Sequence, residues 1–266
     1  MKTCQIVDQP AGGVYHIRDE LGVCVTLIVG ENRALLFDTG YGLGGLRGII
    51  RDITDKPLTV VNSHGHWDHA LGNWMFPEAR LHPDDFALYE SVCAPGARLG
   101  TLRRAEQEDA LPPGFDREEY LNAPNAKIIP ETGETLALGG VDAQIIPMPG
   151  HTRGSVVLYL PQKELIVMGD NWNPTVWVFF AYGLPVFPFR EALRDILKLP
   201  FRQVLTSHGE RAYPRETLEQ YVLGMTDELI LNAPKDRDTP YWQDYDTRRC
   251  SPLPGMPLVF DGQRIR

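Results

Sequence analysis

The sequence contains one dense cluster of metal-binding side chains, Asn62-Ser63-His64-Gly65-His66-Trp67-Asp68-His69. This cluster directly follows the apolar run 58–62, which predicts a buried strand. A loop that leaves a buried strand can bring side chains together without breaking a hydrogen-bond ladder. His64 and His66 are two residues apart, so in an extended loop they point the same way; Asp68 continues that alternation and His69 faces elsewhere. The spacing can therefore supply two adjacent metal centres rather than one.

Three further polar residues follow predicted apolar strands in the same manner. His151 comes after the run 141–146, Asp170 after 165–168 and His208 after 203–207. Each has a glycine close by, which lets the backbone turn sharply. Five of the seven histidines therefore lie in loops at strand ends, and we interpret the other two, His16 and His82, as structural or surface residues.

In its order, this series resembles the signature of the metallo-β-lactamase superfamily, which is His-x-His-x-Asp-His followed by a distant His, an Asp and a last His. The matching residues are His64, His66, Asp68, His69, His151, Asp170 and His208. The segment Phe37-Asp38-Thr39-Gly40 is similar to the superfamily's early strand-end element. Seven positions in order are a far more specific signal than one short motif. The resemblance implies an α/β (α+β) protein with the metallo-β-lactamase fold, a four-layer αββα sandwich.

The resemblance also implies two divalent metal ions at one edge of that sandwich. His64, His66 and His151 would hold the first ion, Asp68, His69 and His208 the second, and Asp170 would bridge both. Imidazole and carboxylate suit zinc, and the lack of a thiolate ligand leaves iron or manganese possible. Such a pair of ions can share a hydroxide near neutral pH. We assign Asp68 the catalytic role of orienting that hydroxide or passing on its proton.

The sequence differs from particular branches of the superfamily, and these differences limit the functions that we expect of the chain. The common zinc β-lactamases carry a cysteine where Asp170 stands, and the flavodiiron proteins carry a glutamate at the position of His66. A bridging aspartate instead resembles glyoxalase-II-like thioesterases, acyl-homoserine lactonases and several phosphodiesterases. The leading hypothesis is a dinuclear zinc-dependent hydrolase of an ester, thioester or lactone. A metal-dependent phosphodiesterase or nuclease, an iron-dependent oxygenase and a non-catalytic metal-binding protein of the same fold are the alternatives.

An aromatic segment at about 171–188 follows the predicted ligand Asp170. We expect its large side chains to form an apolar wall of the substrate pocket. An insertion packed on its own core, or a dimer contact, is the alternative. The candidate substrate-binding residues are Trp172, Trp177, Phe179 and Tyr182.

The composition is that of a globular protein: 266 residues, 43% hydrophobic, with a formal net charge of −9. We expect a single domain over residues 1–266, with an irregular, partly helical excursion at about 94–125 and an irregular tail at about 232–266. The net charge argues against nucleic acid as a partner. The partner that we expect is a small-molecule substrate, and a homodimer is possible. The longest apolar stretch, 176–187, is too short to span a bilayer, so no membrane association is expected. Four scattered cysteines and the absence of a signal peptide predict a cytoplasmic location.

Overall fold

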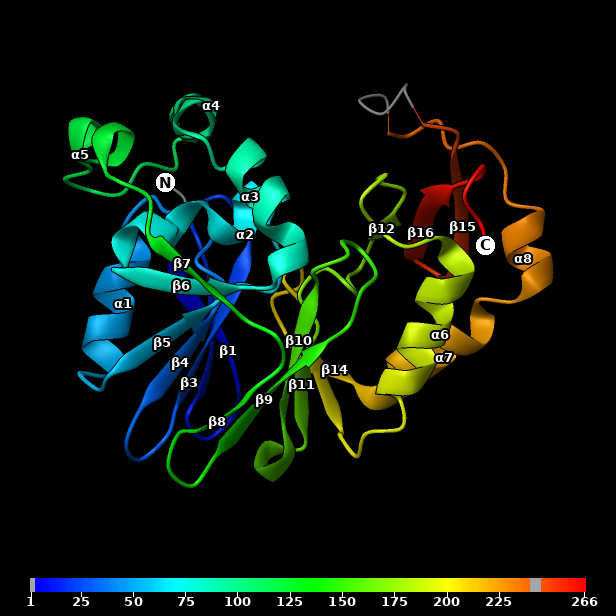
Figure 1. Cartoon of the computed structure of the whole chain (residues 1–266), viewed down its shortest axis with the longest axis horizontal. Coiled ribbons are helices and arrows are strands. Elements are labelled where there is room, and N and C mark those ends of the chain that lie inside the picture. The colour runs from blue at the N-terminus through cyan, green and yellow to red at the C-terminus, as the bar shows by residue number, and fades with distance from the viewer. Residues whose placement is uncertain (1–2, 240–244) are drawn as a thin grey trace.

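The computed structural model describes residues 3–239 and 245–266, and two large β-sheets form its centre (Figure 1). The first sheet has seven strands in sequence order, antiparallel from β1 to β4 and parallel from β4 to β7. These strands are β1 (Gln5–Ala11), β2 (Val14–Arg18), β3 (Cys24–Val29), β4 (Ala34–Phe37), β5 (Leu58–Val61), β6 (Glu78–Leu81) and β7 (Lys127–Pro130).

The second sheet has six strands in the order β14-β13-β11-β10-β9-β8. They are β8 (Thr135–Ala137), β9 (Asp142–Pro147), β10 (Val156–Leu160), β11 (Leu165–Val167), β13 (Gln203–Leu205) and β14 (Tyr213–Pro214). Strands β11 and β13 are parallel, and the other neighbours in this sheet are antiparallel. Because β11 and β13 run the same way, the loops that follow them leave the sheet at the same edge.

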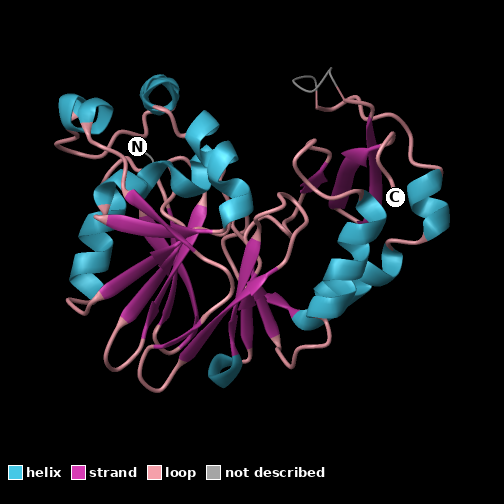
Figure 2. Ribbon diagram, viewed as in Figure 1, coloured by secondary structure: helices cyan, strands magenta, loops and turns pink. Residues whose placement is uncertain are grey.

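Helices lie on the outer sides of the two sheets (Figure 2). Those associated with the first sheet are α1 (Gly45–Ile53), α2 (Trp67–Ala70), α3 (Phe86–Val92), α4 (Pro95–Gln107) and α5 (Arg117–Asn122). Those beside the second sheet are α6 (Val186–Ile196), α7 (Arg215–Gly224) and α8 (Asp227–Leu231). Short 3-10 turns occupy Leu71–Met75, Pro83–Asp85 and Pro161–Lys163.

The alternation of side chains along the buried strands explains the layers. In β4, Leu35 and Phe37 pack with residues of the second sheet, whereas Ala34 and Leu36 pack with Leu46 of α1. The strand β10 behaves likewise, since alternate residues join the core between the sheets and the core beneath α6 and α7. Successive side chains of a strand point to opposite faces, so both faces of each sheet are apolar and covered. The predicted αββα sandwich is confirmed.

The C-terminal tail differs from the sequence-based expectation of an irregular segment. Its described part forms a hairpin of β15 (Thr247–Leu253) and β16 (Met256–Asp261), with Gly255 at a positive φ of 79° in the turn. Strand β16 pairs in parallel with β12 (Val176–Val178), which belongs to the aromatic segment. The pairing of β12 with β16 was missed because it joins segments about 80 residues apart in the sequence, which local patterns do not reveal.

The helices α7 and α8 are separated at Met225 by a short break. The segment 94–125 contains α4 and α5. Across residues 3–239 and 245–266, none of the helices has the length and apolar character needed to cross a membrane.

Candidate metal centre

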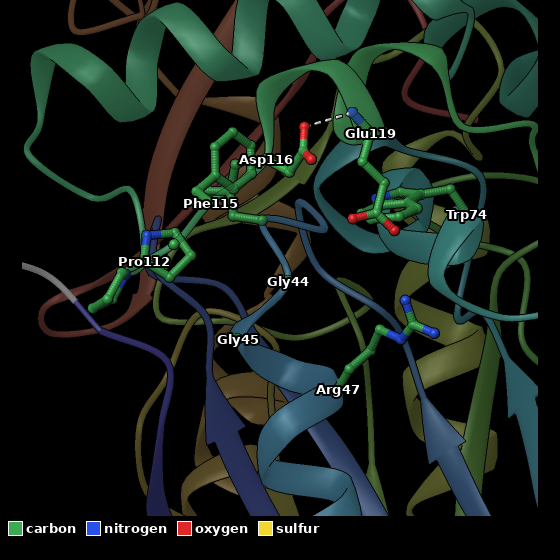
Figure 3. Close-up of a pocket in the computed structure, with 11 residues that line it drawn as sticks. Gly44, Gly45, Arg47, Trp74, Pro112, Phe115, Asp116 and Glu119 are labelled. Carbon is green, nitrogen blue, oxygen red and sulfur yellow. Dashed lines mark hydrogen bonds between the residues drawn. The ribbon is translucent and has the colours of Figure 1, made fainter.

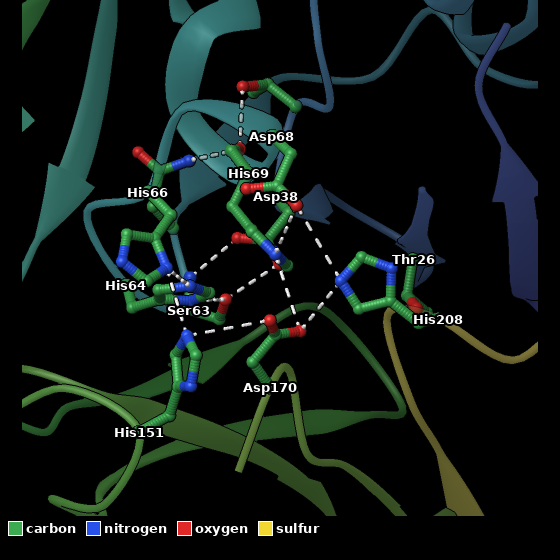
Figure 4. A network of polar contacts seen from close by, with 12 residues as sticks. Thr26, Asp38, Ser63, His64, His66, Asp68, His69, His151, Asp170 and His208 are labelled. Carbon is green, nitrogen blue, oxygen red and sulfur yellow. Dashed lines mark hydrogen bonds and ion pairs between the residues drawn. The ribbon is translucent and has the colours of Figure 1, made fainter. Parts of the chain in front are cut away.

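All seven predicted ligands lie in loops or first turns that follow strands of the two sheets. His64 and His66 leave β5, and Asp68 and His69 belong to the short helix α2. The second sheet supplies the other three from the loops after β9, β11 and β13, namely His151, Asp170 and His208. The two sheets thus contribute to one cluster at their shared edge (Figure 4).

Three imidazoles converge on one point of this cluster. The Nε2 atom of His64 lies 3.0 Å from Nδ1 of His66, and Nε2 of His151 lies 2.9 Å from the same His66 atom. A tetrahedral zinc ion with nitrogen ligands at about 2.0–2.1 Å spaces those nitrogens by about 3.3 Å. The three donors could therefore hold a single ion with a small outward adjustment.

A second group of ligand atoms lies beside the first. The Nε2 atom of His69 is 3.6 Å from Asp68 Oδ2, and Nε2 of His208 is 3.7 Å from the same oxygen. These three residues could hold a second ion.

The carboxylate of Asp170 joins the two groups (Figure 4). Its Oδ1 lies 3.4 Å from Nε2 of His69 and 3.4 Å from Nε2 of His208. Its Oδ2 lies 3.7 Å from Nε2 of His151. One carboxylate therefore contacts members of both sets.

Partners on the opposite ring nitrogens fix the orientation of the imidazoles in the first loop. Nδ1 of His69 lies 3.0 Å from the buried carboxylate of Asp38. Asp38 also accepts hydrogen bonds from the Ser63 backbone N–H at 2.7 Å and from the Ser63 hydroxyl at 2.8 Å. That hydroxyl lies 2.9 Å from Nδ1 of His64. Such contacts hold the rings in the orientation that directs their free nitrogens at a metal.

The remaining two buried imidazoles are oriented by the aromatic segment. Nδ1 of His151 lies 2.6 Å from the backbone carbonyl of Trp177, and Nε2 of His66 lies 2.7 Å from the hydroxyl of Tyr182. The ring of Phe180 packs edge-on against both imidazoles, at 5.2 Å from His66 and 5.4 Å from His151. The aromatic segment thus supports the cluster from the side of the second sheet.

The electrostatics of the cluster suit cation binding. Burial, together with the neighbouring imidazoles, holds the pKa of His64 and that of His66 well below the ordinary value. Burial also lowers the pKa of His151. Although burial opposes it, the carboxylate of Asp170 raises the pKa of His69 and that of His208. The lowered pKa values favour the neutral form of His64, His66 and His151, which is the form of imidazole that binds metals. The raised pKa values of His69 and His208 reflect nearby carboxylates, which would also attract a cation.

One buried atom supports the fit of the donor set to a cation. Nε2 of His69 is fully buried and makes no hydrogen bond among the described residues, although carboxylate oxygens of Asp170 and Asp68 lie 3.4 and 3.6 Å away. Buried polar atoms without partners are rare and need an explanation. An ion at the second group of ligands would satisfy this nitrogen while neutralising the carboxylates of Asp68 and Asp170. The residues present therefore fit two divalent ions.

Comparison with known proteins agrees with this geometry. The family model described as the metallo-beta-lactamase superfamily matches residues 18–208, which include every ligand of the cluster. The chain belongs to the metallo-β-lactamase superfamily.

Curated relatives within the superfamily include an acyl-coenzyme A thioesterase, MBLAC2, of Bos taurus. It is 26% identical to this chain over 162 residues, covering 55% of this chain and 57% of the relative. A hydroxyacylglutathione hydrolase of Hyphomonas neptunium is 30% identical over 147 residues, covering 53% of this chain and 43% of the relative. The chain thus spans about half the length of the curated relatives it matches.

Solved structures share the fold. A metallo-beta-lactamase family protein from Thermus thermophilus has a TM-score of 0.61 at 20% identity, covering 84% of this chain and 82% of that protein. The protein TTHA1623, solved in a di-iron-bound form, has a TM-score of 0.53 at 25% identity, covering 73% of this chain and 90% of its own.

The four predicted substrate-binding residues occupy different environments in this superfamily member. Trp172 is fully buried and packs edge-on against Tyr213 and Tyr221, so the prediction that it lines the pocket is wrong. Phe179 is also fully buried, in a cluster with Val259 of β16. Both residues lie in hydrophobic cores that also contain residues of the C-terminal hairpin, which the sequence did not predict. Only Trp177 and Tyr182 are partly exposed and reach the metal cluster.

Sequence reasoning missed the residue that ties the ligand loops together. Asp85, at the start of α3, is 2% exposed and accepts hydrogen bonds from the backbone N–H of Gly65 at 2.9 Å and of Gly154 at 2.9 Å. It also accepts one from the hydroxyl of Thr152 at 2.7 Å. In the sequence, Asp84-Asp85 looks like an ordinary helix start, so no local signal distinguishes it. The role of Asp38, by contrast, could be anticipated from the sequence, because this residue directly follows a buried strand.

The two histidines left outside the metal set have structural contacts. His16 is fully buried, with its ring nitrogens 3.1 Å from the Thr26 hydroxyl and 2.9 Å from the Gly209 carbonyl. His82 accepts a hydrogen bond from the Asp84 backbone N–H at 3.3 Å. Their interpretation as structural residues is confirmed.

A separate pocket of about 260 Å³ lies where the glycine-rich loop enters α1 (Figure 3). It is lined by Gly44, Arg47, Trp74, Phe115 and Glu119, among others, and includes none of the metal-cluster residues. The backbone N–H of Gly45 donates to the carboxylate of Glu20 at 3.1 Å. This N–H is already hydrogen-bonded to a carboxylate of the protein, so it is not available to a ligand. The glycine-rich loop therefore serves as the turn that leads into α1.

Proposed function

We propose that the protein is a dinuclear zinc-dependent hydrolase that cleaves the thioester bond of a small, partly apolar substrate. The observation that carries this proposal is the position of the Asp170 carboxylate, 3.4 Å from the imidazoles of both His69 and His208 and 3.7 Å from that of His151. A carboxylate in that position can bind two cations at once. Ester or lactone hydrolysis would use the same arrangement.

When bound, the two ions would supply Lewis acidity and lower the pKa of a coordinated water. Residues of the chain would carry out the proton transfers. Asp68 has a side chain that is 17% exposed, with an oxygen beside both His69 and His208. From that position it can accept a proton from the attacking water and return it to the departing thiolate or alkoxide.

The relatives favour a thioester among the possible bonds. The printed names describe hydrolysis of acyl-coenzyme A in one case and of hydroxyacylglutathione in the other. In both molecules, sulfur carries the acyl group. A thiolate is also a better leaving group than an alkoxide, so the reaction needs less help from a general acid near the leaving atom.

Zinc is the metal that we propose, because five imidazoles and two carboxylates suit it. Iron is the second candidate, and one observation favours it: the structural neighbour TTHA1623 was solved in a di-iron-bound form. Iron would make an oxygenase of the same fold the alternative function.

The test combines metal analysis with a substrate panel on purified protein. Elemental analysis should find about two equivalents of zinc per chain. Thiol release from short and medium acyl thioesters should stop after dialysis against a chelator and return with zinc. Iron at the same stoichiometry, together with oxygen consumption when a persulfide is the substrate, would indicate that the protein is an oxygenase rather than a hydrolase. Faster turnover of a bis-aryl phosphate than of any thioester would identify a phosphodiesterase.

A pair of histidine variants supplies the matched control. His208→Ala removes a ligand whose side chain is 38% exposed, so the fold should tolerate the change while thioester hydrolysis is lost. His82→Ala removes a histidine outside the cluster and should leave hydrolysis unchanged. Equal activity in the two variants would contradict the proposed centre.

A further inference from the structure

A groove of about 360 Å³ runs along one face of α4, close to the metal cluster. Its volume falls near the lower end of the range for small-molecule sites. The residues that form its walls come from α2, α3, α4 and the loop after β4; they are Tyr41, Trp67, Val92, Ala97, Gly100, Thr101 and Arg104. The α4 residues among them recur at the spacing of one helix face, so α4 forms a continuous wall.

Two of these residues connect the groove to the reacting centre. Trp67 stands between the ligands His66 and Asp68 in the chain, and its ring centroid is 5.9 Å from that of His66. The side chain of Trp67 is 40% exposed, which is unusual for so large an apolar group. On the other wall, Tyr41 lies in the loop after β4, three residues after Asp38, whose carboxylate is 3.0 Å from Nδ1 of the ligand His69. The groove therefore opens beside the metal cluster.

The chemistry of the lining suits an uncharged, apolar chain. Arg104 is the one charged residue among the described residues that line the groove. Its Nε donates to Glu108 at 2.7 Å, and one of its terminal nitrogens donates to the Tyr41 hydroxyl at 2.7 Å. Its guanidinium carbon lies 5.2 Å from the centroid of the Tyr41 ring. Because these contacts already engage its charge, the groove offers no strong site for an anion.

We infer that this groove binds the acyl chain of the substrate, a straight, medium-length hydrocarbon chain whose carbonyl carbon lies at the metal cluster. The inference rests on the proposed function, since it assigns the groove to the acyl side of the scissile bond. Burying one methylene group stabilises a complex enough to raise kcat/KM about fourfold. The enzyme should therefore prefer longer chains until the groove is full.

Gly100 offers a way to fill the groove without touching the cluster. A side chain at this position would meet no other described atom within 4 Å of its Cβ, because the space there is open. Gly100 lies inside α4, where leucine is a better helix former than glycine, so Gly100→Leu should fold at least as well as the wild type. Gly48→Leu is the matched control, since Gly48 lies inside α1, has the same open surroundings and does not line the groove.

The first measurement is kcat/KM on zinc-loaded protein for straight-chain acyl thioesters from acetyl to dodecanoyl. We expect a rise of about fourfold per methylene up to medium length in the wild type and in Gly48→Leu. Gly100→Leu should lose tenfold or more on the decanoyl thioester and stay within about twofold on the acetyl thioester. A chain-length profile that is the same in all three proteins would overturn the assignment of the groove.

The second measurement is calorimetric binding of sodium decanoate and sodium acetate to the same three proteins. The carboxylate interacts with the metals in both ligands, so the ratio of the two affinities reports on the chain alone. A ratio that collapses only in Gly100→Leu supports the groove, and a ratio that is unchanged overturns it, even if no thioester is hydrolysed. Absence of turnover on every thioester would refute the proposed function separately.

Discussion

Asp85→Ala tests whether one buried carboxylate holds the two ligand loops in register. The side chain of Asp85 accepts three hydrogen bonds: from Gly65, between two histidine ligands of the first loop, and from Thr152 and Gly154, which follow His151 in the second. The first loop leaves a strand of one sheet and the second leaves a strand of the other. Asp85 is therefore a direct link between the two halves of the metal centre.

The expected loss of stability follows from these contacts. Each hydrogen bond to a charged acceptor contributes about 1.5–3 kcal/mol, and removing the acceptor leaves buried donors unpaired. With three such donors and some entry of water into the space, the free energy of unfolding should fall by about 4 kcal/mol. Such a loss is a large part of the stability of an ordinary domain. Because both loops become freer, zinc affinity should fall about 10–100-fold.

Urea unfolding at pH 7 and competition with a chromophoric chelator measure the two quantities. Asp84→Ala is the control, because the neighbouring Asp84 side chain is 63% exposed and its carboxylate lies 3.9 Å from His82. The control should change stability by less than about 0.5 kcal/mol. A loss below about 1 kcal/mol for Asp85→Ala, together with unchanged zinc affinity, would refute the view that this carboxylate positions the ligands.

Three other predictions concern the bridging ligand, an imidazole partner and a buried acid. Asp170→Asn should reduce bound metal below two ions per chain and slow hydrolysis, because the shared anionic bridge is removed; unchanged metal content and rate would refute the ligand assignment. Tyr182→Phe removes the 2.7 Å contact with His66 but keeps the ring stacked on Phe180, so zinc affinity in chelator competition should fall by up to about tenfold while urea stability stays constant. Burial and the charge of Asp19 raise the pKa of Glu20 from 4.5 to about 7. The folded state therefore binds the proton of the Glu20 carboxyl more tightly than the unfolded state does, and the free energy of unfolding falls as the pH rises between those values. Glu20→Gln should therefore raise the free energy of unfolding by about 3 kcal/mol at pH 8 and by less than about 1 kcal/mol at pH 5; equal effects at the two pH values would contradict this.

The parts of the fold that local sequence predicts are the buried strands. In β4 and β10 every residue is buried, so their apolar runs stand out from the turns around them. By contrast, β1 contains Pro10 and is half-exposed along its length, as expected of an edge strand. The strand β6 has four residues, one of them Glu78, and its pattern is too short to recognise. Strands that depend on distant partners leave weak local signals.

The candidate site likewise has a part that the sequence predicts and a part that it does not. The convergence of the candidate ligands could be predicted from the sequence because each follows an apolar strand, and strand ends of a layered sheet meet at one edge. The residues that orient the ligands could not, since the carbonyl of Trp177 and the carboxylate of Asp85 come near the cluster only after folding. The error at Trp172 has the same origin. An aromatic residue two positions after a ligand looks exposed to the pocket until the partners that bury it, Tyr213 and Tyr221, are known.

The division of the ligands between the two sheets links metal binding to the packing of the sandwich. His64, His66, Asp68 and His69 come from the first sheet, and His151, Asp170 and His208 from the second, so neither sheet alone holds a complete set. Nitrogen atoms of the buried imidazoles lie 2.9–3.0 Å apart, and the hydrogen bonds around them hold the rings in this arrangement. Ions that bind this arrangement also favour the state in which the sheets are packed. Contacts such as those of Asp85 therefore serve both purposes: they hold the sheets together at this edge, and they keep the ligands close enough to bind metal.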